Sequence, residues 1–138
     1  MRKIIKTNFG ISLFIFGVII LLLFPALILD SPATEKTRVR WIGVDQINKI
    51  IEEQKPVIVD LRTPAEYERG HISGALNVPI ETLRSNRSTL DIYKDNPVLL
   101  YCRTINKTDL AIWFLEGRGF KSIYALKGGY EAYRLSSR

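Results

Sequence analysis

The chain has 138 residues, of which 46% are hydrophobic and 25% are charged, a balance that suits one globular domain together with an apolar segment. The single cysteine excludes an intramolecular disulfide and a zinc site built from several cysteines. With only one histidine as well, we expect neither a metal nor a cofactor. The net charge is +6, but Arg2, Lys3 and Lys6 carry half of this excess, so the rest of the chain is only mildly basic. This balance favours small anionic partners and does not support nucleic-acid binding.

The first thirty residues contain a long uncharged segment. Residues 1–8 form a basic tail, and residues 9–29 carry no charge and are long enough as a helix to cross a bilayer. A cleaved secretory signal is the alternative, but the apolar core of such a signal is about 7–15 residues long and precedes a small-x-small site. Because Ser31-Pro32-Ala33 fits such a site poorly, we predict an uncleaved, single-pass transmembrane helix that contacts the lipid bilayer.

The flanking charges give the expected orientation of this helix. The basic tail favours an N-terminus in the cytoplasm, although Lys36, Arg38 and Arg40 compete from the other side at a greater distance from the helix. We therefore expect the domain to lie outside the cytoplasm. Residues 30–38 are polar, include a proline and are predicted to be a linker between the membrane and the domain.

From residue 39 to residue 138, short apolar runs alternate with helical patterns. In chain order these patterns predict a strand at 39–42, a helix at 44–54, a strand at 57–61, one or two helical turns at 64–70, a short strand within 75–80 that ends at Pro79, a helical turn at 80–83, a strand at 98–101, a helix from an N-cap at Thr108 to a stop at Gly117, a strand at 122–126 and a helix at 130–135. The polar stretch 84–96 has no clear pattern. The alternation predicts an α/β domain over 39–138, with a parallel sheet of about five strands and helices on both faces.

The only cysteine, Cys102, directly follows the apolar run "VLLY" at 98–101. A lone cysteine is often a small buried hydrophobe. In open parallel sheets, however, active sites lie beyond the carboxyl ends of the strands, which is where Cys102 is expected. A tight turn from this strand into a helix would direct backbone N–H groups and the positive end of the helix dipole towards one point. Arg103 and Lys107 add positive charge, which Asp109 partly opposes, so the loop is suited to stabilise a thiolate, a persulfide or a bound oxyanion.

Three motifs in order connect this loop to a known family. They are "VIVDLRTPAEYERGHISGALNVPI" at 57–80, "YCRTINKT" at 101–108 and "GFKSIYALKGGYEAY" at 119–133. In this order and at these spacings the sequence resembles the rhodanese-like domain family over residues 42–134. The resemblance implies a rhodanese-like fold, and here a single such domain behind a membrane anchor.

The resemblance also implies sulfur transfer. On this interpretation Cys102 takes the outer sulfur of an anionic donor such as thiosulfate, carries it as a persulfide, and passes it to a thiol or another nucleophile, which is covalent catalysis by an activated thiolate. The substrate-binding loop would consist of Arg103, Thr104, Ile105, Asn106, Lys107 and Thr108, whose backbone N–H groups surround the sulfur. Arg103 and Lys107 would attract the donor. No cofactor is implied, and a protein partner is not identified.

The loop departs from the family pattern, which is close to C-R-x-G-x-R-[ST]. Lys107 stands where the family usually has arginine and lacks the planar fork that binds an oxyanion through two parallel bonds. Ile105 stands where the family has glycine. If that position requires a positive φ, a β-branched residue there would be strained. Cysteine phosphatases need an arginine six residues after the cysteine, where this chain has Thr108, so the loop does not support phosphatase activity.

Three residues are expected to support the site structurally. Asp60 and Arg62, just past a buried strand, are predicted to form a buried ion pair or a loop brace. His71 could be a general base for Cys102, but in this family its motif has the form of a structural turn, and we expect a hydrogen-bonded structural histidine.

Three functions remain open from the sequence. The first is a membrane-anchored sulfurtransferase that uses Cys102. The second is a catalytically weak or inactive rhodanese-like domain that acts as a membrane-anchored binding or scaffold module, a hypothesis that the substitutions at positions 105 and 107 favour. The third is a redox sensor in which Cys102 forms a mixed disulfide with a partner.

Overall fold

The computed structural model describes residues 36–137. The predicted basic tail at 1–8, the predicted transmembrane segment at 9–29 and most of the predicted linker at 30–38 lie outside the described residues. Within 36–137, no helix is both long enough and apolar enough to cross a membrane.

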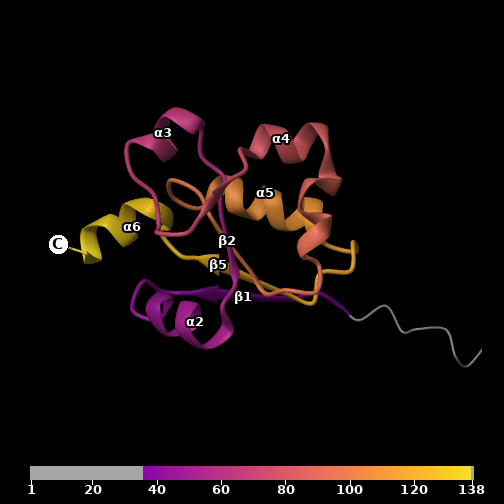
Figure 1. Cartoon of the computed structure of the whole chain (residues 1–138), viewed down its shortest axis with the longest axis horizontal. Coiled ribbons are helices and arrows are strands. Elements are labelled where there is room, and N and C mark those ends of the chain that lie inside the picture. The colour runs from indigo at the N-terminus through magenta and orange to yellow at the C-terminus, as the bar shows by residue number, and fades with distance from the viewer. Residues whose placement is uncertain (1–35, 138) are drawn as a thin grey trace, which may run out of the picture. The chain divides into compact units, whose positions relative to one another are not determined.

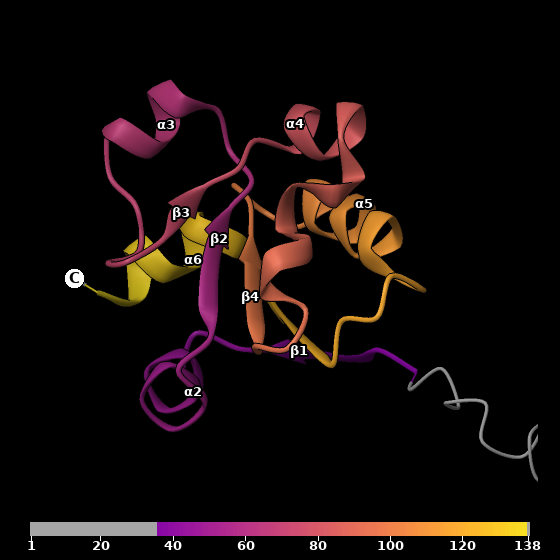
Figure 2. The same cartoon turned by 45° about the vertical axis from the view of Figure 1, so that its right-hand side comes forward.

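A five-stranded sheet forms the centre of the described domain, as predicted, and all its strand pairs are parallel. The strands are β1 (Arg38–Ile42), β2 (Val57–Asp60), β3 (Leu76–Asn77), β4 (Val98–Tyr101) and β5 (Ser122–Leu126), in the spatial order β1-β5-β4-β2-β3. Figure 2 shows β2 between β3 and β4. The central strand β4 is buried at all four residues because helices cover both faces of the sheet.

Helices cover the sheet from both sides, which confirms the predicted layers. They are α2 (Ile47–Gln54), α3 (Pro64–Glu68), α4 (Ile80–Ser85), the 3₁₀ helix η1 (Arg87–Tyr93), α5 (Asn106–Leu115) and α6 (Gly129–Ser136). One apolar cluster joins the sheet to α4, η1 and α5, and a second joins the opposite face to α2 and to tyrosines of α3 and α6. In Figure 1, α2 accordingly lies across the sheet from α4 and α5.

Several element boundaries differ from the predictions for local reasons. Residues 43–46 form a turn closed by the bond from Gln46 N–H to the Gly43 carbonyl, so α2 begins only at Ile47. Strand β3 has two residues, because Pro79, which has no N–H, directly precedes α4. The 3₁₀ helix η1 was not predicted, and it begins where the side chain of Asn86 accepts a bond from the Ser88 N–H, at 3.0 Å.

The N-cap predicted at Thr108 is wrong, and this error bears on the site. Helix α5 begins at Asn106, its N-cap is Ile105, and no side chain caps it. The N–H of Thr108 donates to the Ile105 carbonyl at 2.9 Å, so Thr108 already belongs to the first turn of the helix. The turn between β4 and α5 is therefore shorter than predicted and consists of residues 102–105.

Candidate active site

Cys102 lies at the carboxyl end of β4, where the sequence places it, and only 2% of its surface is exposed. It belongs to the apolar cluster that includes Leu100 of β4 and Ala111 of α5. The five residues that follow it, 103–107, are all exposed. The cysteine therefore lies at the base of a loop whose remaining residues face solvent.

The N-terminal end of α6 fixes the backbone of this loop. The Tyr130 N–H donates to the Cys102 carbonyl at 2.8 Å, and the Glu131 N–H donates to the Arg103 carbonyl at 3.1 Å. Gly129 lies directly against the loop: a Cβ there would overlap the carbonyl oxygens of Cys102, Arg103 and Thr104. With a φ of +58°, Gly129 also has a backbone conformation that favours glycine. The "GG" turn thus lets α6 approach the loop closely.

This anchoring determines where the loop N–H groups point. In a trans peptide the carbonyl of one residue and the N–H of the next point in opposite directions. Because the carbonyls of residues 102–104 face α6, the N–H groups of residues 103–105 point away from it. The N–H groups of Asn106 and Lys107 are the first two of α5, which has no side-chain cap. The five consecutive N–H groups are those of residues 103–107. Apart from bonds within a helix, none of them donates to a backbone carbonyl of residues 36–137.

Ile105 is not strained in this loop. Its φ is −142° and its ψ is −36°, and among the described non-glycine residues only Lys55 has a positive φ. The strain that a positive φ would impose on isoleucine is therefore absent from this backbone. The side chain is 38% exposed and adds apolar surface at the start of α5.

Thr108 has a buried hydroxyl without a partner. The residue is fully buried, and its Oγ1 is the only buried side-chain nitrogen or oxygen without a hydrogen bond in the described part of the chain. Threonine in a helix commonly donates to the carbonyl four residues earlier, but this hydroxyl does not. Buried polar side-chain atoms in native folds almost always have a partner, so this hydroxyl is a polar group with hydrogen-bonding capacity to spare beside the start of α5.

Arg103 is not a free cation, contrary to the simple expectation from the sequence. Its Nε and Nη2 both lie 3.0 Å from Oε1 of Glu66 in α3. Glu66 also completes a capping box with Thr63, the N-cap of α3. Burial raises the pKa of Glu66, but hydrogen bonds from Thr63 and the charge and hydrogen bond of Arg103 outweigh it, so this pKa is below its ordinary value. Lys107 is exposed, and its side chain has no ion pair within the described residues.

Asp60 and Arg62 form a buried ion pair beside the loop. Asp60, at the end of β2, is fully buried and Arg62 is 5% exposed. The Arg62 Nη2 lies 2.6 Å from Asp60 Oδ2 and also donates to the Gly70 carbonyl at 2.7 Å. Its guanidinium stacks on Tyr130 of α6, with Cζ 3.8 Å from the ring centre. Desolvation lowers the pKa of Arg62, but the bond to Asp60 and its charge outweigh it, so this pKa is raised.

His71 lies on the surface and contacts Tyr67. Its Nδ1 is 2.9 Å from the Tyr67 carbonyl, and the two rings stack with their centres 3.8 Å apart. Both of these contacts are structural.

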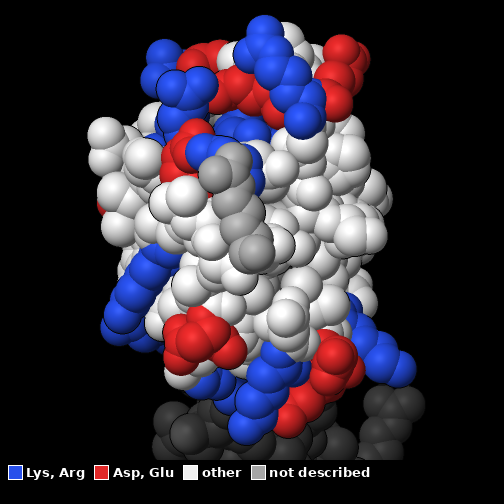
Figure 3. All heavy atoms as spheres, turned by 90° about the vertical axis from the view of Figure 1, so that its left-hand side faces the viewer, with Lys and Arg blue, Asp and Glu red and all other residues white. Residues whose placement is uncertain are grey.

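A cavity of about 180 Å³ lies beside the loop and contains residues that the sequence analysis did not assign to the site. Figure 3 shows acidic and basic side chains side by side at the upper end of the face that carries α3 and α6. The cavity is lined by Arg62, Glu66, Arg69, Gly70, Arg103, Tyr130, Glu131 and Arg134. These residues come from three separate segments, so no local pattern predicts that they meet.

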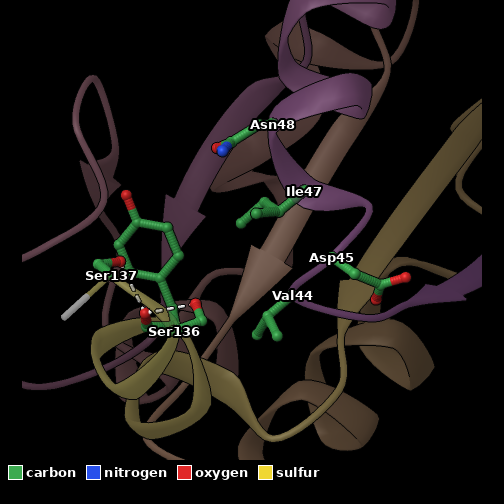
Figure 4. A pocket seen from close by; sticks show the side chains of 7 residues that line it. Val44, Asp45, Ile47, Asn48, Ser136 and Ser137 are labelled. Carbon is green, nitrogen blue, oxygen red and sulfur yellow. Dashed lines mark hydrogen bonds between the residues drawn. The ribbon is translucent and has the colours of Figure 1, made fainter.

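A larger cavity of about 460 Å³ lies between the start of α2 and the end of α6, and none of its lining residues belongs to the Cys102 loop. Figure 4 shows Ser136 and Ser137 at its edge, where their hydroxyls donate to the Tyr133 carbonyl, both at 2.8 Å. Because both serine hydroxyls are already bonded to the Tyr133 carbonyl and the cavity has no residue of the Cys102 loop, we assign the candidate site to the smaller cavity and the adjoining loop.

The sequence is similar to those of known proteins. The chain is 32% identical over 124 residues to the uncharacterized protein YqhL of Bacillus subtilis, an alignment that covers 85% of this chain and 92% of that one. It is 30% identical to the tRNA uridine(34) hydroxylase of Buchnera aphidicola over 71% of this chain, but spans only about a third (33%) of that protein.

Solved structures show the same fold. A rhodanese-related protein from Thermoplasma volcanium superposes with a TM-score of 0.61 at 26% identity, over 70% of this chain and 92% of that one. A rhodanese-like domain protein from Staphylococcus aureus superposes with a TM-score of 0.58 at 27% identity, over 68% and 90%. Residues 43–136 match the rhodanese-like domain family. On its fold, its loop and these matches, the chain belongs to the rhodanese-like domain family.

Proposed function

We propose that this protein is a sulfurtransferase that carries sulfane sulfur as a persulfide on Cys102. One observation carries the proposal: five consecutive backbone N–H groups, those of residues 103–107, directly follow the cysteine. Apart from bonds within a helix, none of them has a backbone partner in the described domain. Backbone N–H groups held by a rigid scaffold stabilise an anion without reorganisation during the reaction. The buried, unpartnered Thr108 hydroxyl adds one more polar group near the start of α5.

The proposed reaction has two steps that balance in atoms and electrons. In the first, the Cys102 thiolate attacks the outer sulfur of thiosulfate, the S–S bond of thiosulfate breaks, and its electron pair leaves with sulfite. In the second, an acceptor thiolate attacks the outer sulfur of the Cys102 persulfide, and the Cys102 thiolate returns as the leaving group. The loop N–H groups stabilise the anionic sulfur in both steps, and Lys107 attracts the donor.

Thiocyanate formation from thiosulfate and cyanide tests this proposal. We expect turnover by the wild-type protein and none by Cys102→Ala. Cys102→Ser keeps a polar side chain of similar size, and it should also be inactive because it lacks the sulfur. Thiocyanate formation that survives in Cys102→Ala would contradict the proposal.

A binding or scaffold module is the second candidate, and two observations favour it. Cys102 is 98% buried, and Glu66 already neutralises Arg103, so the loop has less free positive charge than its sequence suggests. If this candidate is correct, a Cys102→Ser variant retains the cellular role of the protein. A loss of that role in a stably folded Cys102→Ser protein would exclude it.

We also propose that residues 9–29 anchor the domain in a membrane, with the N-terminus in the cytoplasm and the domain outside it. The uncharged length of the segment and the basic residues before it support this proposal. Because Cys102 is buried and is the only cysteine, a Cys102→Ser, Ser137→Cys protein carries one exposed thiol. A membrane-impermeant maleimide should label it in intact cells, and labelling only after lysis would contradict the orientation.

A further inference from the structure

We propose that the solvent-facing side of α5 is the surface through which two copies of this chain form a symmetric dimer. The surface consists of Asp109 and Trp113 of α5, Glu116 at its C-terminal cap and Arg87 of η1, and we call it the Trp113 face. It has an aromatic centre with charges of both signs around it. The inference does not depend on the sulfur chemistry proposed for Cys102.

The helical repeat places three of these residues on one side of α5. Successive residues of an α-helix are about 100° apart, so Asp109, Trp113 and Glu116 fall within a sector of about 60°. All three are exposed, and the buried residues of α5 lie outside this sector. Glu116 follows the last helical residue, but its N–H still donates to the Ile112 carbonyl at 2.8 Å, so the helical turn extends to it.

Trp113 is the centre of this surface and is held in place by its neighbours. Its side chain is 58% exposed, although tryptophan is mostly buried in folded proteins. The Cζ of Arg87 lies 4.8 Å from the centre of its ring, and the ring of Phe114 lies 5.4 Å away. A ring held in this way loses little side-chain entropy on binding. Tryptophan and arginine are also the residue types that most often dominate the binding energy of protein interfaces.

The charges of the Trp113 face have no ion-pair partners within residues 36–137. Arg87, Asp109 and Glu116 take part in none of the ion pairs of the described domain. By contrast, Asp91 and Arg118 pair with each other at 2.7 Å. The Trp113 face therefore exposes one cation and two carboxylates whose charges are not balanced by a direct contact within the described chain.

A second copy of this chain fits these charges better than a partner of one sign. A purely acidic or purely basic partner would leave one sign unpaired, and the two carboxylates would repel an anionic lipid surface. In a symmetric dimer the same surface of both copies meets itself, so each contact occurs twice. Asp109 and Glu116 lie on opposite sides of Trp113 along the helix. When the two indole rings pack together, one of these carboxylates can therefore meet Arg87 of the other copy.

Sedimentation velocity of the full chain in a mild detergent tests the inference. For the wild type we expect an equilibrium between monomer and dimer that shifts towards the dimer as the protein concentration rises. Trp113→Ala and Arg87→Glu should each raise the dimer Kd about tenfold or more, because each removes a central contact that occurs twice. Circular dichroism checks that each variant folds.

Two substitutions outside the surface are matched controls. Leu135 of α6 is 62% exposed, so Leu135→Ala removes an exposed apolar side chain as Trp113→Ala does. Arg84 is exposed and pairs with Glu81 within α4, so Arg84→Glu makes the same charge change as Arg87→Glu. Both controls should keep the wild-type Kd.

A second charge reversal shows whether Arg87 pairs across the interface. Arg87→Glu is combined with Asp109→Arg in one double variant and with Glu116→Arg in another. One of the two should return the Kd to within about threefold of wild type, because the ion pair is restored with its charges exchanged.

Three outcomes would overturn the inference. The first is a wild-type protein that sediments as a monomer at every concentration at which it is soluble. The second is a dimer that neither Trp113→Ala nor Arg87→Glu weakens, because that dimer would form through another part of the chain. The third is an Arg87→Glu protein that neither double variant restores. None of these results bears on persulfide formation at Cys102, so the proposed sulfurtransferase function is tested separately.

Discussion

Ile105 shows how a single residue can look like a defect in the sequence and be tolerated in the fold. The family has glycine at this position, yet the backbone here has a φ of −142°, which isoleucine adopts without difficulty. The position therefore does not require glycine in this chain. The substitution changes the surface of the loop rather than its course.

Ile105→Gly should accordingly bring no large gain in sulfur transfer. We expect the rate of persulfide formation to stay within about threefold of wild type and the free energy of unfolding to fall by about 0.5–1 kcal/mol, because glycine loses more backbone entropy on folding. Stopped-flow kinetics and urea unfolding measure the two quantities. A rate gain of a hundredfold would show that Ile105 holds the loop in an unproductive shape.

Thr108→Val separates a structural from a functional role for the buried hydroxyl. The variant removes a polar atom that has no partner in the described domain, so the free energy of unfolding should rise by about 1 kcal/mol. Persulfide formation should nevertheless slow by about tenfold if the hydroxyl binds the transferred sulfur. A less stable Thr108→Val protein with the wild-type rate would contradict both expectations.

Two helices other than α5 hold the active loop. Helix α6 binds the carbonyls of Cys102 and Arg103 through its first N–H groups, and α3 holds the Arg103 side chain through Glu66. These contacts join segments that are far apart in the chain. The sequence indicates each helix by its local pattern, but not that both would meet at one loop.

Gly129→Ala tests the close approach of α6, with Gly74→Ala as its control. Both glycines have a positive φ, but a Cβ at Gly74 meets nothing within 4 Å, whereas one at Gly129 overlaps three carbonyls. Gly74→Ala should lower the free energy of unfolding by about 1–2 kcal/mol. Gly129→Ala should lower it further and also abolish persulfide formation. Equal effects of the two substitutions would show that the contact with the loop is not tight.

Glu66 should make part of the stability of the domain sensitive to acid. Its folded-state pKa is below its ordinary value of about 4.5, so its stabilising contribution is present above that pH and is lost as the pH falls through the lower folded value. Chemical unfolding at a series of acidic pH values should show a smaller loss of stability for Glu66→Gln than for wild type. Arg103→Gln should reduce the same loss, and identical pH profiles for all three proteins would contradict this assignment.

At the scale of the whole molecule, most of the fold follows from the sequence. The apolar runs at 57–61 and 98–101 predict buried parallel strands, and the position of Cys102 after the second run places it at the carboxyl edge of the sheet. Two features do not follow. The polar η1 helix has no apolar periodicity, and the arginine-lined cavity forms only when the topology brings 62–70, Arg103 and 130–134 together.

The sheet, α6 and α5 each contribute a feature that supports the same proposed function. Cys102 lies at the edge of the sheet, and the first N–H groups of α6 bind the loop carbonyls, which therefore point towards α6. Because of this, and because α5 begins without a side-chain cap, the loop N–H groups remain available. Each of these features is unnecessary for a cysteine that only fills the core. Their combination is the physical basis for proposing that Cys102 carries sulfur.

The intact mass of the protein after treatment with thiosulfate alone tests this central claim most directly. The account predicts that wild type gains the mass of one sulfur atom, that peptide mapping locates it on Cys102, that Cys102→Ser gains none, and that dithiothreitol removes it. No gain in mass from about pH 6 to about pH 9, the range in which thiols ionise, would contradict the account.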